Sequence, residues 1–368
     1  MKLRRALGWI ALAIPLLAIL VLAVGYWLSD NDCGKAAAPG VPMKAIVYCD
    51  YGTADVLRLE EVEKPVPGDD EILVRVHAAG VNPLDWHYMR GTPYLMRLSS
   101  GLRKPKDTRV GVDYAGTVEA VGRNVTRFQP NDQVFGGRSG ALAQYVVAKQ
   151  DGAVAIKPAN VGFEQAGAVA IAATTALQGL RDAGRLEAGD KVLINGASGG
   201  VGTFAVQIAK SMGAEVTAVC SSRNVELVRS LGADHVVDYT RDDYTSADVR
   251  YDVILDNVGN RSLAENRRVL EPDGRYVLIG GGGPEAGNWI GPMVKPLQAL
   301  LTSPFVSQDM GMFLTSVTRE DMQRLAELMS SGAVTPVIDR RYALSEAAAA
   351  IRYLEQGRAR GKVVVTME

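Results

Sequence analysis

The stretch from Lys191 to Gly202 reads Lys-Val-Leu-Ile-Asn-Gly-Ala-Ser-Gly-Gly-Val-Gly, and a helical run that begins Thr-Phe-Ala-Val-Gln follows it. A short apolar strand therefore enters a glycine turn that opens a helix. Such a turn lets the backbone approach a pyrophosphate, which the free N–H groups of the helix N-terminus bind. Ala197 replaces the first glycine of the strict G-x-G-x-x-G pattern, so the context of strand, helix and second strand carries the prediction. We expect a dinucleotide-binding unit; the alternative is a tight turn without a ligand.

The end of the second strand indicates which dinucleotide is bound. Residues 215–220 are followed by Ser221-Ser222-Arg223, without the carboxylate that an NAD site places there for the ribose hydroxyls. A guanidinium can pair with a 2′-phosphate, and serine hydroxyls can donate to it. The sequence therefore predicts NADP(H), with a solvated surface arginine as the alternative.

The pattern of apolar runs predicts an α/β protein with two kinds of sheet. After residue 163, short apolar strands alternate with helices, which is typical of a doubly wound parallel sheet. From Met43 to about residue 160 the segments are β-rich with few helix signals, and glycines in 110–121 suggest a bent sheet. A strand over 311–316 is expected to close the parallel sheet, and Thr318 to cap a helix that ends near Gly332.

The N-terminus forms a separate segment. Ala6 to Leu28 are 23 uncharged residues preceded by Lys2, Arg4 and Arg5, long enough as a helix (about 35 Å) to cross a bilayer. We expect an uncleaved single-pass membrane anchor, with a short linker over 30–42; a cleaved signal peptide is the alternative. The flanking charges favour an N-terminus in the cytoplasm and the bulk of the chain outside, but we leave the side of the membrane open.

Composition excludes several classes of function. The 40 basic and 41 acidic residues leave no positive excess for nucleic acid. Three cysteines and three histidines lie far apart, and no pair has metal-ligand spacing. The odd number of cysteines argues against a disulfide framework.

Six motifs follow one another along the chain: Asn82-Pro83-Leu84-Asp85, Gly111-Val112-Asp113-Tyr114-Ala115-Gly116, Thr175-Ala176-Leu177, the glycine turn 195–202, Asp256-Asn257-Val258-Gly259 and Gly361-Lys362-Val363-Val364. In this order they make the chain from Met43 onward resemble the medium-chain dehydrogenase/reductase superfamily, and most of all its zinc-free quinone oxidoreductase branch. The resemblance implies a GroES-like catalytic domain over 43–165 and 317–368, a Rossmann domain over 166–316, and an active site between them. A homodimer is also possible, because dimers are common in this family.

The resemblance also implies roles for single residues. Asn82 and Asp85 would shape the nicotinamide end of the cleft, and Tyr94, one residue later than the tyrosine of some relatives, is a candidate proton donor. The cofactor would be held by Thr175, Ser198, Gly199, Gly200, Val201, Ser221, Arg223, Tyr239, Asn257, Gly280, Gly281 and Lys362. Zinc members carry Cys in place of Asn82 and His in place of Val112, so no metal site is expected.

Without a Lewis acid, hydride addition needs an acceptor that delocalises charge, such as a quinone or an α,β-unsaturated carbonyl. We therefore expect NADPH-dependent reduction of such a small molecule. A 2-enoyl thioester reductase is one alternative, since the basic residues of 97–109 could meet CoA phosphates. A non-catalytic NADPH-binding membrane-associated protein is another. An anchor would suit a lipid-soluble quinone, although the outward orientation conflicts with NADPH being a cytoplasmic metabolite.

Overall fold

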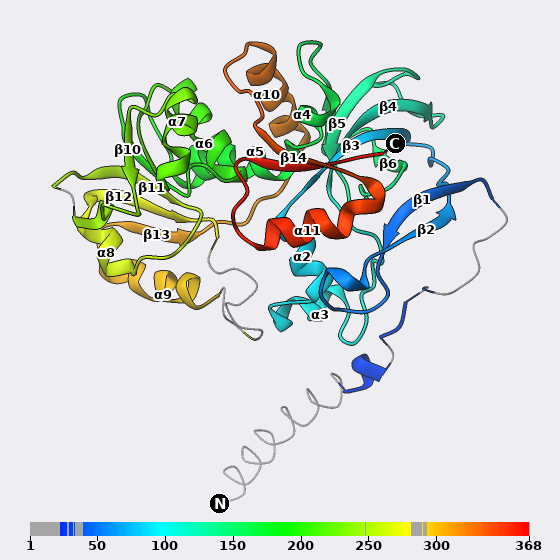
Figure 1. Cartoon of the computed structure of the whole chain (residues 1–368), viewed down its shortest axis with the longest axis horizontal. Helices are drawn as coiled ribbons and strands as arrows, with labels where there is room; N and C mark the ends of the chain where they lie inside the picture. Colours follow the sequence, from blue (N-terminus) through cyan, green and yellow to red (C-terminus); the bar gives the residue numbers. More distant parts are fainter. Residues whose placement is uncertain are drawn as a thin grey trace, which may run out of the picture.

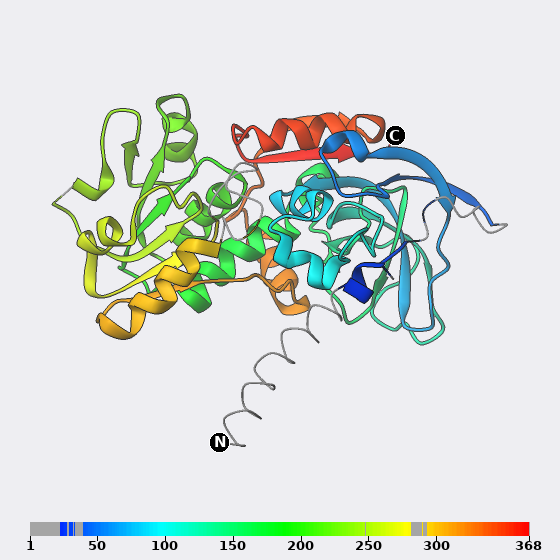
Figure 2. The same ribbon diagram turned by 90° about the horizontal axis from the view of Figure 1, so that it is seen from below.

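The computed structural model describes residues 23–27, 29–31, 33, 40–246, 248–280, 289 and 293–367. The chain forms two lobes, which lie side by side in two perpendicular views (Figure 1; Figure 2). The middle of the chain makes one lobe, and the N-terminal part and the last strands and helix make the other. The α/β fold expected from the sequence is confirmed.

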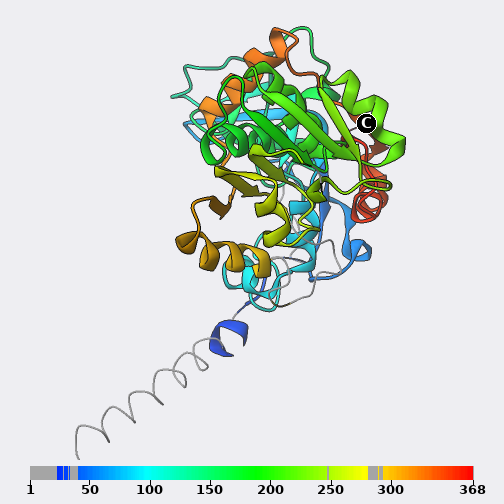
Figure 3. The same ribbon diagram turned by 90° about the vertical axis from the view of Figure 1, so that its left-hand side faces the viewer.

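The first lobe contains a parallel six-stranded sheet with the order β10-β9-β8-β11-β12-β13. Helices lie on both of its faces (Figure 3). Because both faces are covered, the inner strands are continuous apolar runs; Val192, Leu193 and Ile194, for example, are fully buried. The strands are β8 (Lys191–Asn195), β9 (Glu215–Cys220), β10 (His235–Asp238), β11 (Tyr251–Asp256), β12 (Leu270–Leu278) and β13 (Asp309–Met312).

The second lobe contains a seven-stranded sheet with the order β14-β15-β3-β4-β5-β7, in which β6 also pairs with β3. Its two C-terminal strands join strands from the start of the chain, since β15 runs antiparallel to β3. A separate hairpin of β1 (Pro42–Val47) and β2 (Arg58–Glu63) flanks it. The strands are β3 (Glu71–Val81), β4 (Asp113–Val121), β5 (Gln133–Gly137), β6 (Tyr145–Lys149), β7 (Val154–Ile156), β14 (Ile338–Ala343) and β15 (Lys362–Thr366).

Several expected strand limits differ from the structure. The strand expected over 110–121 begins only at Asp113, because Gly111 has a φ of +91°, outside the range of a strand. The strand expected over 311–316 is β13, which begins at Asp309 and ends at Met312, where its partner β12 ends. The predicted cap of the later helix is confirmed, since Thr318 Oγ1 accepts from the amide of Asp321 at 3.1 Å.

Helices connect the strands and cover the sheets. Those that bear on the site are α2 and α6, which begin beside the two groups of predicted site residues. The helices are α2 (Pro83–Arg90), α3 (Arg97–Ser100), α4 (Phe163–Ala166), α5 (Ala170–Gln178), α6 (Gly200–Ser211), α7 (Val225–Ser230), α8 (Leu263–Arg268), α9 (Val294–Thr302), α10 (Arg319–Ser330) and α11 (Ala347–Glu355).

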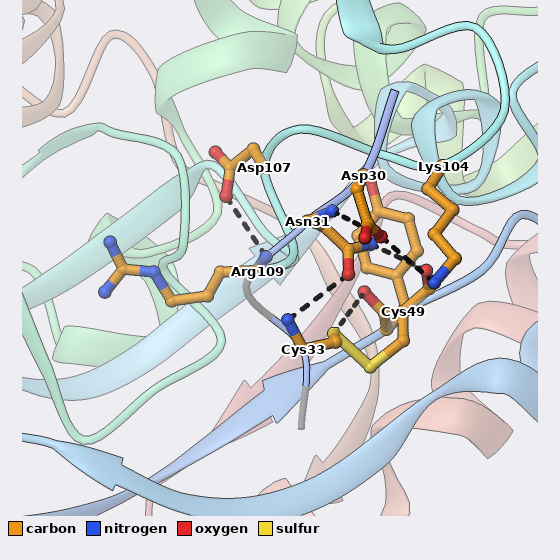
Figure 4. Close-up of a disulfide and its surroundings, with 8 residues drawn as sticks. Asp30, Asn31, Cys33, Cys49, Lys104, Asp107 and Arg109 are labelled. Carbon is orange, nitrogen blue, oxygen red and sulfur yellow. Dashed lines mark hydrogen bonds and ion pairs between the residues drawn. A yellow bond between two sulfur atoms is a disulfide. The ribbon is translucent and has the colours of Figure 1, made fainter. Parts of the chain in front are cut away.

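The described residues of the N-terminal segment correct one expectation. Cys33 and Cys49 form a disulfide, with an S–S distance of 2.13 Å, which leaves Cys220 as a buried free thiol (Figure 4). The odd cysteine count was misleading because the segment expected to be a free linker lies against the domain. Asn31 Nδ2 donates to the carbonyl of Cys49 at 2.7 Å, and Asp30 pairs with Lys104 at 3.2 Å.

Most of the expected membrane span over 6–28 lies outside the described residues. Residues 23–27, which the structure describes, are helical. Within the part of the chain that the structure describes, we find no helix both long and apolar enough to cross a membrane.

The second sheet contains a buried ion pair, and the residue just before it is hydrogen-bonded to the glycine turn of the first lobe. Lys362, the first residue of β15, places its Nζ 3.3 Å from Asp113 Oδ2, and the two side chains are 3% and 0% exposed. The same ammonium donates to Asn82 Oδ1 and to the carbonyl of Val81 at 3.2 Å. The preceding amide, Gly361 N, donates to the carbonyl of Ser198 in the glycine turn at 2.9 Å.

We predict that Lys362→Met lowers the free energy of unfolding by about 3–5 kcal/mol, because it leaves the Asp113 carboxylate buried without its counter-charge. Lys210→Met is the matched control, since Lys210 pairs with Asp234 at the surface, where the side chains are 34% and 36% exposed. Such a pair contributes at most about 1 kcal/mol. Urea unfolding of the cofactor-free proteins measures the free energy of unfolding of both variants. Equal decreases in Lys362→Met and Lys210→Met would contradict the prediction.

Candidate functional site

The glycine turn between β8 and α6 leaves an open cradle of backbone. Gly202 must be glycine, because a Cβ there would lie 2.2 Å from the carbonyl oxygen of Gly196. At Gly199, by contrast, a Cβ would meet no atom closer than 3.5 Å, while at Gly200 it would lie 3.3 Å from Cδ of the Lys362 side chain. The turn thus packs tightly on its inner side and stays open on its outer side, at the N-terminus of the twelve-residue helix α6. This is the geometry that a diphosphate needs.

The ends of β9 and β10 bring together predicted residues with one that sequence reasoning missed. Asn224 is 4% exposed, and its Nδ2 donates to Ser198 Oγ at 2.9 Å and to Ser221 Oγ at 3.3 Å. Its Oδ1 is buried and has no hydrogen-bond partner among the described residues. The sequence does hold a clue to Asn224: it directly follows Arg223 and therefore lies at the carboxyl edge of the sheet, where the other predicted cofactor residues lie.

Arg223 and Tyr239 lie at this edge with their side chains exposed. Arg223 Nη2 donates to the carbonyl of Arg358 at 2.8 Å, a contact from the second lobe that orients the guanidinium without neutralising it. Asp238, at the end of β10, accepts from the hydroxyls of Ser222 and Thr240. Within the described residues no carboxylate pairs with Arg223, so its charge remains available to an anion.

The edge continues at the ends of β11 and β12. Asn257 Nδ2 donates to the carbonyl of Asn195 at 2.9 Å, while its Oδ1 is buried without a partner in the described structure. Gly280 lies against it, since a Cβ would come within 2.7 Å of the carbonyl of Asn257. Thr175 Oγ1, on α5, contacts Thr315 Oγ1 at 2.7 Å. Gly281, also predicted here, lies outside the described residues.

The predicted catalytic residues Asn82 and Asp85 form the capping box of α2. Asp85 Oδ2 accepts from the amide of Asn82 at 2.7 Å, and both residues are buried. Burial, opposed by this hydrogen bond and reinforced by the nearby Asp113 charge, raises the pKa of Asp85 from 3.8 to about 7. The Lys362 ammonium donates to Asn82 Oδ1 and so fixes the orientation of the side-chain amide. Its other end, Asn82 Nδ2, is a buried donor without a partner among the described residues.

Tyr94 lies in a different environment. Its ring makes an edge-on contact with Trp289, with the centroids 5.2 Å apart, and the Arg97 guanidinium lies 4.6 Å from its centroid. The described structure does not place Tyr94 in the pocket beside Asp85. His87, which follows Asp85 on α2, stacks on Trp86, and its Nδ1 lies 2.7 Å from the carbonyl of Thr92. Burial lowers the pKa of His87, so this ring is predominantly neutral at pH 7.

A pocket of about 510 Å³ lies beside the capping box. Leu84, Asp85 and Tyr88 line it from α2, and Gly111 and Val112 bound it next to the buried Asp113. Its volume falls in the range of small-molecule sites. The remaining lining residues are Tyr48, Ser99, Ser100, Lys106, Asp107, Arg109, Val110, Gly137, Arg138, Ser139, Ala153 and Val317.

The residues at the carboxyl edge of the parallel sheet fit a dinucleotide. The backbone cradle is open at Gly199, and two buried amide oxygens on that edge, of Asn224 and Asn257, lack partners among the described residues. Buried polar groups are nearly always paired, so each of these oxygens indicates a ligand group or an ordered water.

We predict that the Asp85 carboxyl makes the protein less stable as the pH rises. Its folded-state pKa of about 7 exceeds the ordinary value of 3.8, so its stabilising contribution is complete below pH about 4 and is lost as the pH rises through 7. Between pH about 5 and about 8, the unfolding free energy of the parent should fall by roughly 2–3 kcal/mol relative to Asp85→Asn. Denaturant titrations at both pH values measure this, with Asp242→Asn as an exposed control. A constant difference between parent and Asp85→Asn would refute it.

Comparison with known proteins agrees with this architecture. Residues 68–158 match the alcohol dehydrogenase GroES-like domain, and residues 231–365 match the zinc-binding dehydrogenase family. The chain is 33% identical to the 2-methylene-furan-3-one reductase of Solanum lycopersicum, over 88% of this chain and 79% of that protein. It is 32% identical to the quinone oxidoreductase of Sus scrofa, over 88% and 98%.

Among solved structures, the quinone oxidoreductase from Coxiella burnetii superposes with a TM-score of 0.77 and 28% identity, over 89% of this chain and all of that one. The two sheets, the glycine turn and these relatives together establish that the chain belongs to the medium-chain dehydrogenase/reductase superfamily and is an oxidoreductase of the quinone oxidoreductase-like type.

Proposed function

We propose that this chain is a zinc-independent reductase that uses NADPH to reduce a quinone or an α,β-unsaturated carbonyl compound. The observation that carries the proposal is the pairing of an open dinucleotide cradle with a small-molecule pocket on either side of the Asn82, Asp113 and Lys362 cluster. The relatives support the substrate class, because one is named a quinone oxidoreductase and the other reduces a methylene-furanone, which is an enone.

Bound NADPH would supply the hydride. We infer that the glycine turn holds its diphosphate end, that Asn257 and Thr175 lie along it, and that Ser221 and Arg223 receive its 2′-phosphate. Lys362, assigned to the cofactor from the family resemblance, lies beside the turn, with its ammonium bound by Asn82, Asp113 and the carbonyl of Val81. Gly280, Gly281 and Tyr239 are assigned to the same site from the family resemblance. The ribose hydroxyls of the cofactor would donate to the unpaired oxygens of Asn224 and Asn257, and the exposed guanidinium of Arg223 would pair with the 2′-phosphate.

On the substrate side, reduction adds hydride to one carbon and a proton to the conjugated carbonyl system. Asn82 Nδ2 is a buried donor that lacks a partner within the described structure, and we propose that it donates to the developing oxyanion. Asp85 lines the pocket, and its raised pKa lets its carboxyl hold a proton at neutral pH. Tyr94 remains a candidate donor from the sequence alone.

The zinc-independent part of the proposal rests on Lys362. Its ammonium donates to Asn82 Oδ1 and lies 3.3 Å from Asp113 Oδ2, so a fixed positive charge already balances the buried carboxylate. A divalent cation at the same place would repel this ammonium. We therefore propose a quinone or enone as the acceptor, since neither needs a metal ion to polarise its carbonyl group.

We also propose that residues 6–28 attach the protein to a membrane, from their length and lack of charge. The disulfide of Cys33 and Cys49 and the flanking charges favour the oxidising side of that membrane, whereas a need for NADPH favours the cytoplasmic side. Alkylation of free thiols in intact cells decides between the two. Labelling of Cys33 and Cys49 would place them on the reducing, cytoplasmic side, whereas their protection as a disulfide would place them on the oxidising side. A homodimer is proposed from family membership alone.

The reaction is tested with the purified full-length protein in detergent. NADPH and NADH oxidation is followed with quinones, enones, an enoyl thioester and a simple aldehyde, with and without a chelator. We expect NADPH oxidation with quinones or enones that the chelator does not alter. Aldehyde reduction abolished by the chelator would replace the proposal with a zinc dehydrogenase, and tight NADPH binding without turnover would favour a binding protein.

We predict that Arg223→Gln raises the KM for NADPH by roughly 10- to 100-fold and leaves the KM for NADH unchanged, because a charge-assisted contact with the 2′-phosphate is lost. Arg229→Gln is the control, since Arg229 is also exposed and pairs with Glu226 at 2.9 Å. Steady-state kinetics with both cofactors measures this. An equal rise for NADH would assign Arg223 a role in folding or in the lobe contact through Arg358.

A further inference from the structure

The pocket beside Asp85 carries an excess of positive charge. Three basic side chains line it, Lys106, Arg109 and Arg138, and we call them the cationic rim. All three are exposed, whereas Asp85 is buried. Much of the remaining lining is apolar or aromatic, including Leu84, Val112 and Val317. The apolar lining of the pocket is therefore suited to the carbon skeleton of a substrate, and the cationic rim is suited to an anionic group.

No carboxylate neutralises the rim within the described residues. Asp107 is the other acidic lining residue, but its carboxylate accepts from the amide of Arg109 at 3.1 Å and from the hydroxyl of Ser139. The Arg109 and Arg138 guanidinium groups make no hydrogen bond or ion pair in the described structure, and Lys106 Nζ donates only to the carbonyl of Ser99, at 3.1 Å. In Figure 4 the Arg109 guanidinium extends away from Asp107.

The backbone holds Arg109 in place. Arg109 forms an antiparallel bridge with Val47, and the amide of Tyr48 donates to the carbonyl of Thr108 at 2.9 Å. The next residue along, Cys49, is fixed to Cys33 by the disulfide. On the other side of the pocket, the amide of Arg138 donates to the carbonyl of Val112 at 2.8 Å. The backbone of both arginines is therefore held by hydrogen bonds. This fixes the point from which each guanidinium group extends, which favours selective binding of an anion.

We propose that Arg109 and Arg138, assisted by Lys106, bind an anionic group of the substrate, so that the enzyme prefers α,β-unsaturated carbonyl compounds that carry a carboxylate or a phosphate. This inference rests on the proposed reductase function and narrows its substrate class. Guanidinium groups are suited to both anions, because their N–H donors match two oxygens at once. The anionic group could be the carboxylate of a free acid or the phosphates of a CoA thioester, and the experiment below distinguishes these two kinds of substrate.

The experiment compares pairs of substrates that differ only in charge. Benzoylacrylate and its methyl ester present the same enone with and without a carboxylate. Crotonyl-CoA and crotonyl-pantetheine present the same thioester with and without phosphates. We expect kcat/KM to be about tenfold or more higher for the charged member of at least one pair, and this preference to shrink as the ionic strength rises.

The variants are Arg109→Gln and Arg138→Gln, each of which should reduce that preference about tenfold by raising KM for the charged substrate alone. Arg109→Lys should restore part of it. Arg127→Gln is the matched control, an exposed arginine of the same lobe that does not line this pocket, and it should leave the preference intact.

A binding measurement keeps this test independent of turnover. Calorimetry with benzoylpropionate, the saturated acid, and with its methyl ester reports affinity for the anion in the protein loaded with NADP. Equal binding and equal turnover of acid and ester, with no preference for the CoA thioester, would overturn the inference and leave the reductase function standing. Tighter binding of the acid that Arg109→Gln and Arg138→Gln abolish would support it, even in a protein that reduces none of the enones.

Discussion

One buried positive charge of the second lobe lies where the two lobes meet. The Lys362 ammonium is enclosed by Asp113 Oδ2, Asn82 Oδ1 and the carbonyl of Val81, that is, by the start of β4 and by the junction of β3 and α2. A charge this deeply buried is tolerated only where its partners are fixed, and each of these partners is held by regular structure. Asn82 caps α2, Asp113 begins β4, and Asp113 Oδ1 also accepts from the amide of Ile171 on α5 at 2.9 Å. The cluster therefore sets where α2, β4, β15 and α5 meet.

The position of the glycine turn follows from the same cluster. The Lys362 side chain passes over Gly200, where a Cβ would lie 3.3 Å from its Cδ, and Gly361 N binds the carbonyl of Ser198. The strand that carries the ammonium is thus bonded to the loop that would carry the diphosphate. Substrate pocket and cofactor cradle are consequently placed by one rigid connection, and a small misplacement of either would separate the reacting atoms.

Sequence patterns predicted the parallel sheet, the glycine turn and the N-cap at Thr318 because each depends on residues close in the chain. The same patterns did not predict features that depend on contacts between distant segments of the chain. The disulfide of Cys33 and Cys49 forms because residues 29–31 fold back on the loop around Lys104, a contact that cysteine counting does not detect. The link from Asn224 to Ser198 and Ser221, and the ammonium between Asn82 and Asp113, likewise join residues that only the tertiary structure brings together.

The pocket then combines two kinds of electrostatic environment. Burial raises the pKa of Asp85 to about 7, so this wall of the pocket carries less negative charge at neutral pH than an ordinary carboxylate would. At its mouth, the exposed Arg109 and Arg138 carry full positive charge that no side chain neutralises within the described structure. A negative group would therefore be drawn to the mouth, while the conjugated part of the molecule extends toward Asn82 and Asp85. That orientation would bring the carbonyl oxygen toward buried donors, which stabilise the negative charge that hydride addition creates there, while the charged end stays with the exposed arginines.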